Sequence, residues 1–306
     1  MNEAVWHATR WWPWAQLMRP ANVVTALADV LAGFAASGAA MSLFASSDPS
    51  AITALMWLLI ATAALYAGGV VFNDVFDAEL DAIERPERPI PSGQVSRRAA
   101  ASFGTLLLIG GVLSAWRVSP FCAALAAAVA LTAITYDVYG KHHEWLGPLN
   151  MGACRGLNLI LGMSAIPAAV THIWFLALIP IVYIAAITLI SRGEVHGGTR
   201  AVGVAALGLM GTLVAGILLL GLTDGFTLTA AAPFLLLFAW YVVPAFVQAA
   251  RQPMPERIRT AVKTGVIMLI ALNAGLAAGF AGIGYGLIVL SLLPVSMGLA
   301  RAFAVT

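Results

Sequence analysis

Long apolar stretches alternate with short polar connections along almost the whole chain. Each stretch has about 20 residues, which is the length an α-helix needs to cross a bilayer. The connections are too short to hold a soluble domain. We therefore expect an all-α membrane bundle of nine or ten transmembrane helices, with residues 1–306 as a single domain. The candidate spans are 22–40, 51–72, 98–116, 119–136, 150–170, 173–191, 201–221, 228–249, 261–281 and 284–300.

The count favours ten spans because residues 261–300 are twice the length of one span and are interrupted by the turn-like sequence GIGYG at 282–286. Residues 1–18 combine tryptophans with arginines, which suits an interfacial segment at the headgroup level. No apolar core with a small-residue cleavage site precedes residue 20, so we expect no signal peptide.

Composition agrees with this topology. Hydrophobic residues make up 61% of the chain and charged residues 10%, and the mean hydropathy is +0.91, which excludes an ordinary soluble globule. With the N-terminus in the cytoplasm, 15 of the 16 Lys and Arg lie on the inner side and only Arg117 lies outside. The net charge of +2 is close to neutral. We expect the lipid bilayer, and no nucleic acid, as a partner.

A dense group of charges follows the second span. On a helix of 3.6 residues per turn, Asp74, Asp77 and Asp81 lie on one face, whereas Glu79 points the other way. Three like charges on one face repel each other unless cations neutralise them. Oxygen ligands without Cys or His favour Mg²⁺, which completes its shell with water and phosphate oxygens. The pattern therefore predicts a site for Mg²⁺ and a diphosphate.

The same segment resembles the first aspartate-rich motif, NDxxDxxxD, of the UbiA superfamily of intramembrane prenyltransferases. Asn73, Asp74, Asp77 and Asp81 match the motif, and RPIPSG from Arg88 resembles its R-P-I-x-S-G continuation. The resemblance implies a helical bundle around a central lipid-open cavity, in which the motif binds Mg²⁺ and an isoprenyl diphosphate. Nine spans are common in that family.

The runs GGVVFNDVFDAELDAIERPERPIPSG, GKHHEWLGPLNMGACRGLN and ITLISRGEVHGG together look closest to the EboC branch of this superfamily. That branch belongs to a bacterial gene cluster associated with a sugar-like or cyclitol metabolite. The resemblance implies a bacterial inner membrane with the active-site loops facing the cytoplasm, and a small-molecule acceptor that is sugar-like or a cyclitol.

The other inner loops supply further candidates. Tyr136 and Lys141 match a Tyr and a Lys that meet the diphosphate in the resembling family, and Asn150 resembles the Asn or Gln that commonly follows. Arg155, in the same Gly-rich loop, adds a bidentate charge for phosphate oxygens. The third loop, SRGEVHGG at 191–198, departs from the family's second motif, usually DxxxD, because it offers the single carboxylate Glu194.

The expected reaction is Mg²⁺-dependent transfer of an isoprenyl group to a small acceptor. The candidates by role are as follows: for catalysis Asp74, Asp77 and Lys141; for the metal Asn73, Asp74, Asp77, Asp81 and Glu194; for the diphosphate Arg85, Arg88, Tyr136, Lys141 and Arg155; for the acceptor Asn22, Asn150 and Asn158.

Several alternatives stay open at this point. Lys141 and Arg155 can equally serve to orient the inner loops. Asp29, the one acid well inside a span, is either functional or a partnered core residue. A transporter would need charged residues near mid-span in two related repeats, and here they lie at span ends apart from Asp29. A non-catalytic lipid-diphosphate binder is not separable from an enzyme by sequence.

Overall fold

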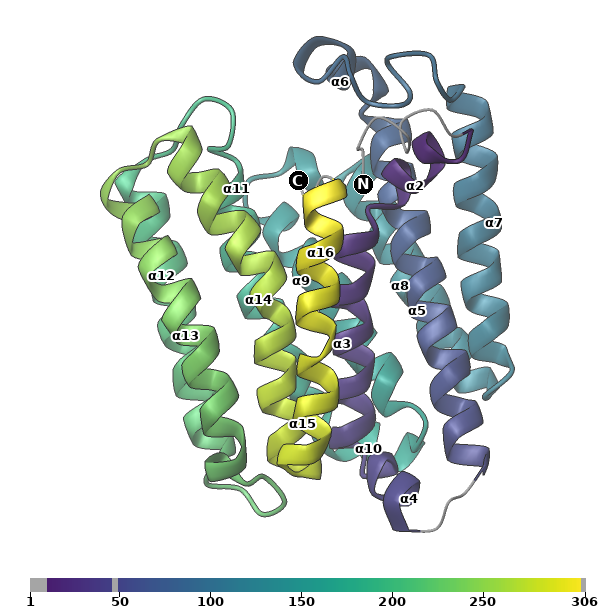
Figure 1. The fold of residues 1–306 in the computed structure, drawn as a ribbon, viewed down its shortest axis with the longest axis vertical. Coiled ribbons are helices and arrows are strands. Elements are labelled where there is room, and N and C mark those ends of the chain that lie inside the picture. The colour runs from purple at the N-terminus through teal and green to yellow at the C-terminus, as the bar shows by residue number, and fades with distance from the viewer. Residues whose placement is uncertain (1–9, 46–48, 304–306) are drawn as a thin grey trace.

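The computed structural model describes residues 10–45 and 49–303, and the regular elements in these residues are all helical. Residues 1–9 of the expected interfacial segment lie outside the described residues. The helices stand side by side in one bundle (Figure 1), which confirms the expected all-α class. The long helices are α3 (Pro20–Ala36), α5 (Pro49–Phe76), α7 (Arg97–Trp116), α8 (Pro120–Val138), α9 (Leu146–Met163), α11 (Leu178–Ser191), α12 (Arg200–Leu220), α13 (Leu228–Arg251) and α14 (Pro255–Ala281).

Shorter helices connect or extend these. They are α2 (Trp12–Met18), α4 (Ala39–Ala45), α6 (Ala78–Glu84), η1 (Gly140–His142), α10 (Pro167–Ile173), η2 (Trp174–Ala177), α15 (Ile283–Leu290) and α16 (Leu292–Ala302). In Figure 1, α6 lies at the end of the bundle where α2 begins and α16 ends.

Eight stretches of helix in the described part are long and apolar enough to cross a membrane, and the pair α2 and α3, bent by 42°, makes a ninth. α9 also packs inside the bundle, against α3, α8 and α11, although it carries several polar residues. The ring of Trp12 stacks on that of Phe303 with centroids 4.7 Å apart, so the two ends of the described chain meet. A chain whose two ends lie at the same end of the bundle crosses the bundle an even number of times. The nine apolar stretches together with α9 give ten crossings.

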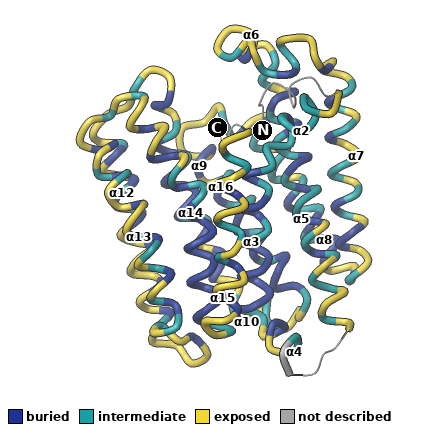
Figure 2. Tube along the Cα trace, in the orientation of Figure 1, coloured by how far each residue is buried: buried dark blue, intermediate teal, exposed yellow. Residues whose placement is uncertain are grey.

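The centre of the bundle is formed by α3, α9, α11 and α14, whose residues are largely buried in Figure 2. The outer helices α7, α12 and α13 expose leucines on the faces that point away from the bundle, among them Leu106, Leu218 and Leu236. Such an apolar outer surface suits contact with lipid tails.

Two glycines allow α3 and α9 to touch closely. A Cβ atom at Gly33 would overlap the carbonyl oxygen of Leu159, and one at Gly162 would overlap that of Val30. Small residues at such crossings let membrane helices approach backbone to backbone. The close crossing places polar residues of α3 and α9 against each other in the interior.

Candidate active site

The acidic segment begins where α5 ends. Asp77 takes the N-cap position of α6 with φ −88° and ψ 4°, so the helix is interrupted there. Backbone hydrogen bonds from Asp77 N to Asn73 O (2.9 Å) and from Asp81 N to Asp77 O (2.8 Å) cross the break. The helix that carries the three carboxylates is therefore not continuous. Asp74 and Asp81 contact the same arginine, whereas Asp77 contacts a lysine.

Arg88 joins the first and third aspartates. Its Nη1 lies 2.8 Å from Asp81 Oδ2 and 3.3 Å from Asp74 Oδ1, and Arg19 Nη2 lies 2.5 Å from the same Asp74 oxygen. Burial, together with the charge of Arg19, lowers the pKa of Arg88 from its ordinary value. Glu79 points away from this group, as expected, and its side chain is 90% exposed. The two buried aspartates are thus neutralised by arginines.

Asp77 is held by a separate set of partners. Lys141 Nζ lies 2.5 Å from Asp77 Oδ1. The Asn73 amide donates to Asp77 Oδ2 (3.2 Å) and to Asp137 Oδ1 (2.9 Å). Asp137 is 3% exposed and was not among the predicted site residues. Its place directly after Tyr136, at the inner end of a span, is the sequence signal that points to it.

Arg19 is a second residue that the sequence interpretation missed. It lies between α2 and α3 with φ 45° and ψ 67°, and it is the one non-glycine residue with positive φ in the described chain. This left-handed conformation is costly for a residue with a Cβ, and such strain is often found at functional sites. The turn directs the guanidinium of Arg19 to Asp74.

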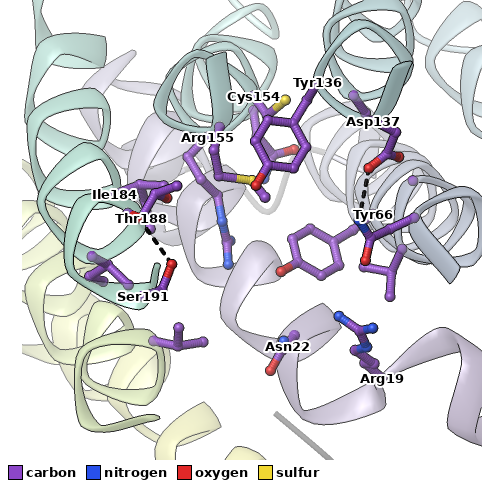
Figure 3. A pocket seen from close by; sticks show the side chains of 18 of the residues that line it. Arg19, Asn22, Tyr66, Tyr136, Asp137, Cys154, Arg155, Ile184, Thr188 and Ser191 are labelled. Carbon is purple, nitrogen blue, oxygen red and sulfur yellow. Dashed lines mark hydrogen bonds between the residues drawn. The ribbon is translucent and has the colours of Figure 1, made fainter. Parts of the chain in front are cut away.

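Two cavities lie at this end of the bundle. The inner cavity has a volume of about 350 Å³ and opens among α3, α5, α8, α9, α11 and α14. Figure 3 shows its side chains, with Tyr66, Tyr136 and Arg155 on the walls and Arg19 and Asn22 beside them. The outer cavity has about 490 Å³ and is lined mainly by charged residues, and Arg19, Arg85 and Glu194 line both cavities. We define these as the inner and the outer cavity.

The third loop contributes Glu194 to both cavities. Glu194 is 8% exposed, and burial raises the pKa of its carboxyl from the ordinary value although Arg85, Arg259 and Arg19 act in the opposite direction. The Nε–H of Arg259 donates to the backbone oxygen of Glu194 (3.0 Å). Arg259 comes from the start of α14 and was not among the predicted site residues.

Below the inner cavity, a buried polar network surrounds Asp29. Arg155 Nη1 donates to Asp29 Oδ2 (2.8 Å), Asn158 Nδ2 donates to the same oxygen (3.1 Å), and Asn273 Nδ2 donates to Asp29 Oδ1 (2.7 Å). The Arg155 guanidinium also lies 4.7 Å from the centre of the Tyr66 ring. Asp29, with 0% exposure, is therefore a partnered core residue.

Two predicted site residues belong to this network. Arg155 lines the inner cavity, but its guanidinium is bound to Asp29 and Thr25. These contacts do not favour binding of the diphosphate by Arg155. The Asn158 amide donates to Asp29 and to the Ala26 carbonyl, and its oxygen accepts from Thr62, so both amide hydrogens and one of the two oxygen lone pairs are used within the bundle. These contacts hold both side chains in the cavity wall, and their roles toward the diphosphate and the acceptor stay predictions.

The remaining candidates divide by place. Asn22, Asn73, Tyr136 and Arg85 line the inner cavity, and Asp74, Arg85 and Arg88 line the outer cavity. Asn150 lines neither cavity and packs against Gly140, and its role toward an acceptor stays a prediction. Asp77, Asp81 and Lys141 also lie outside both linings. Asp81 is paired with Arg88 of the outer lining, and Asp77, which is paired with Lys141, accepts a hydrogen bond from Asn73 of the inner lining.

In the described residues, no group of three or more His, Cys, Asp or Glu side chains has the geometry of a metal site. The donors nevertheless fit Mg²⁺ chemically, because Asn73, Asp74, Asp77 and Asp81 present oxygen atoms only. Each of the three carboxylates contacts a cationic side chain, so their charge requires neutralisation in this structure as well.

Comparison with known proteins gives a family and several relatives. The model of the UbiA prenyltransferase family matches residues 31–257. The digeranylgeranylglyceryl phosphate synthase of Methanothrix thermoacetophila is 35% identical over 157 residues, which are 51% of this chain and 56% of that protein. The synthase of the same description from Methanoregula boonei is 30% identical over 239 residues, 74% of this chain and 78% of that protein. The chain thus aligns with only about half of the Methanothrix relative.

Solved structures share the fold. The apo structure of a UbiA homologue from Aeropyrum pernix K1 has a TM-score of 0.68 at 17% identity, covering 88% of this chain and 98% of that one. A UbiA homologue from Archaeoglobus fulgidus, bound to DMAPP and Mg²⁺, has a TM-score of 0.53 at 15% identity, covering 91% and 99%. At these identities the likeness concerns the fold alone.

Proposed function

The chain belongs to the UbiA prenyltransferase family, and we propose that it transfers an isoprenyl group from a prenyl diphosphate to a small acceptor in the membrane. The observation that carries the proposal is that Asp74 and its two arginines line the outer cavity, which shares three lining residues with an inner cavity whose walls carry a set of apolar side chains. Apolar residues on the cavity walls include Leu65, Val129, Ala133, Ile184, Ile187 and Val266.

We propose that Asn73, Asp74, Asp77 and Asp81 hold Mg²⁺. When bound, the ion supplies positive charge that neutralises the diphosphate leaving group. The Archaeoglobus homologue binds DMAPP and Mg²⁺, which supports the same pair of ligands here. Glu194, a single carboxylate buried near arginines, is a weaker candidate ligand than the aspartates.

The cations of the site would bind the donor. Arg88 and Lys141, which neutralise the aspartates in this structure, become available to phosphate oxygens once the aspartates bind a metal ion. Arg85 lines both cavities and can contact the diphosphate from either, and Tyr136 can donate its hydroxyl from the inner cavity wall.

The inner cavity would then receive the isoprenyl chain. Its apolar walls exclude water from the allylic carbon as the bond to oxygen breaks, so that the acceptor rather than water captures this carbon. We assign to Asn22, which is 6% exposed and lines the inner cavity together with Arg19, the orientation of the acceptor near the diphosphate.

The chemical class of the acceptor is proposed from the relatives. The relatives that match are described as digeranylgeranylglyceryl phosphate synthases, whose name specifies a product with a glyceryl phosphate group. This similarity does not support the EboC branch in particular, so we propose a phosphate-bearing glyceryl lipid before a sugar-like or cyclitol acceptor. The matching organisms likewise give no support for a bacterial membrane. The cytoplasmic orientation of the site remains our proposal from the charge distribution.

The test is transfer by the purified protein in nanodiscs. A labelled prenyl diphosphate is supplied with either geranylgeranylglyceryl phosphate or a cyclitol, with Mg²⁺ or with EDTA. We expect a labelled lipid product only with Mg²⁺, and none from Asp77→Asn. Tight binding of the donor without transfer to either acceptor would refute the enzyme assignment and leave a lipid-diphosphate binder. Uptake of substrate into sealed vesicles without transfer would indicate a transporter.

A further inference from the structure

The outer cavity has two walls of different character. On one wall, Asp74 is neutralised by Arg19 and Arg88. On the other, Arg85 and Arg259 lie near the single carboxylate of Glu194, whose charge both of them influence. Glu84 and Glu87 also line the cavity, but they are exposed to solvent at its rim. Apart from Arg19, which is paired with Asp74, the surroundings of Glu194 thus hold two guanidinium groups for one buried carboxylate.

These two guanidinium groups have unused hydrogen-bond donors. Among the described residues, the side chain of Arg85 has no hydrogen bond or ion pair, and the side chain of Arg259, an exposed residue, is bound only through its Nε, to the backbone oxygen of Glu194. Because that bond fixes one edge of the Arg259 guanidinium, its terminal amino groups are held in a defined direction. Guanidinium groups match the oxygens of a phosphate with paired hydrogen bonds, which a lysine does not do.

We propose that Arg85 and Arg259 bind the phosphate of the acceptor, so that the acceptor is a lipid phosphomonoester. This inference rests on the proposed function, in which the acidic wall and its cations receive the diphosphate of the donor. A cavity of about 490 Å³ holds a phosphate with a glycerol-sized headgroup. Because Arg19, Arg85 and Glu194 also line the inner cavity, the headgroup lies next to the mouth that receives the isoprenyl chain.

Arg259 is the residue to test, because Arg85 is also placed in diphosphate binding. Arg257 provides a matched control: it lies two residues away on α14, is exposed, and donates to Gln248 outside both cavities. We expect Arg259→Gln to raise the KM for geranylgeranylglyceryl phosphate at least tenfold and to change the KM for the prenyl diphosphate less than twofold. The melting temperature of the variant protein should equal that of the wild type. Arg259→Lys should recover part of the loss, and Arg257→Gln should match the wild type.

Binding without turnover separates this inference from the proposed function. Calorimetry with the full-length protein compares three ligands: geranylgeranylglyceryl phosphate, its dephosphorylated alcohol and inorganic phosphate. We expect the phosphorylated lipid to bind at least tenfold more tightly than the alcohol, Arg259→Gln to remove this difference, and inorganic phosphate to compete weakly. That result supports the phosphate site even if no transfer is observed. Equal binding of lipid phosphate and alcohol, or a KM effect of Arg259→Gln on the donor instead, overturns the inference.

Discussion

Asp29 provides the sharpest test of how the interior is held together. It accepts hydrogen bonds from Arg155, Asn158 and Asn273 and thereby joins α3, α9 and α14. Asp29→Ala leaves the Arg155 guanidinium buried without a counter-charge, which costs about 3 to 5 kcal/mol when one member of a buried pair is removed. The two amide donors lose bonds that average about 0.6 kcal/mol each in membrane proteins. We expect a total loss of about 4 to 6 kcal/mol in the free energy of unfolding.

The measurement is reversible unfolding by SDS in bicelles, followed by circular dichroism. Asp224→Ala is the control, because Asp224 is an exposed acid in the connection between α12 and α13, and its effect should stay within about 0.5 kcal/mol. The double variant Asp29→Leu with Arg155→Met should recover most of the lost stability, because well-packed apolar residues can replace a buried ion pair. If the effects of Asp29→Ala and Arg155→Ala simply add in the double alanine variant, the pair is not coupled and the reasoning fails.

Three further predictions concern the site and the topology. Asp77→Asn should abolish prenyl transfer while Glu79→Ala changes it less than twofold, because Glu79 is exposed away from the cavities; equal damage in a transfer assay would contradict this geometry. Because burial raises the pKa of Glu194, the free energy of unfolding should fall as the pH rises from the ordinary glutamate pKa through the raised value. Glu194→Gln should reduce this fall, as measured by melting temperatures across that pH range. A melting temperature whose pH dependence is the same in Glu194→Gln and the wild type would show that burial does not shift the pKa of this carboxyl. Reporter fusions at 90, 145, 256 and the C-terminus should lie on one side of the membrane and a fusion at 224 on the other; a C-terminus on the side of 224 would exclude the ten-span topology.

The hydrophobic pattern predicted the positions of the helices well. The break between α14 and α15 falls at Gly282 (φ 87°), inside the predicted turn at 282–286. The acidic segment and the third loop also meet as the topology requires, since Asp74 and Glu194 line the same outer cavity. Alternation of spans and inner loops determines which loops share one end of a bundle, so this part of the site follows from sequence.

The partners of the aspartates did not follow from sequence. A helix-face argument assumes an unbroken helix, whereas the helix is interrupted at Asp77, and this carboxylate pairs with Lys141, 64 residues away in the sequence. The contact of Arg19 with Asp74 depends on a left-handed turn at Arg19, a conformation that no local pattern in WPWAQLMRP specifies. Both contacts depend on the packing of helices distant in the chain, so neither spacing nor periodicity could reveal them.

The polar character of α9 shows how a departure from the pattern carries information. Arg155 and Asn158 lower the hydropathy of this helix, and from sequence both were assigned to ligands of an inner loop. A charged group at membrane depth is costly unless it is partnered, and here the partner is Asp29, 126 residues away on α3. The same two polar residues line the inner cavity. A helix that is too polar for lipid on every side therefore has to lie inside the bundle, and its polar face marks the wall of the cavity around which the other helices are arranged.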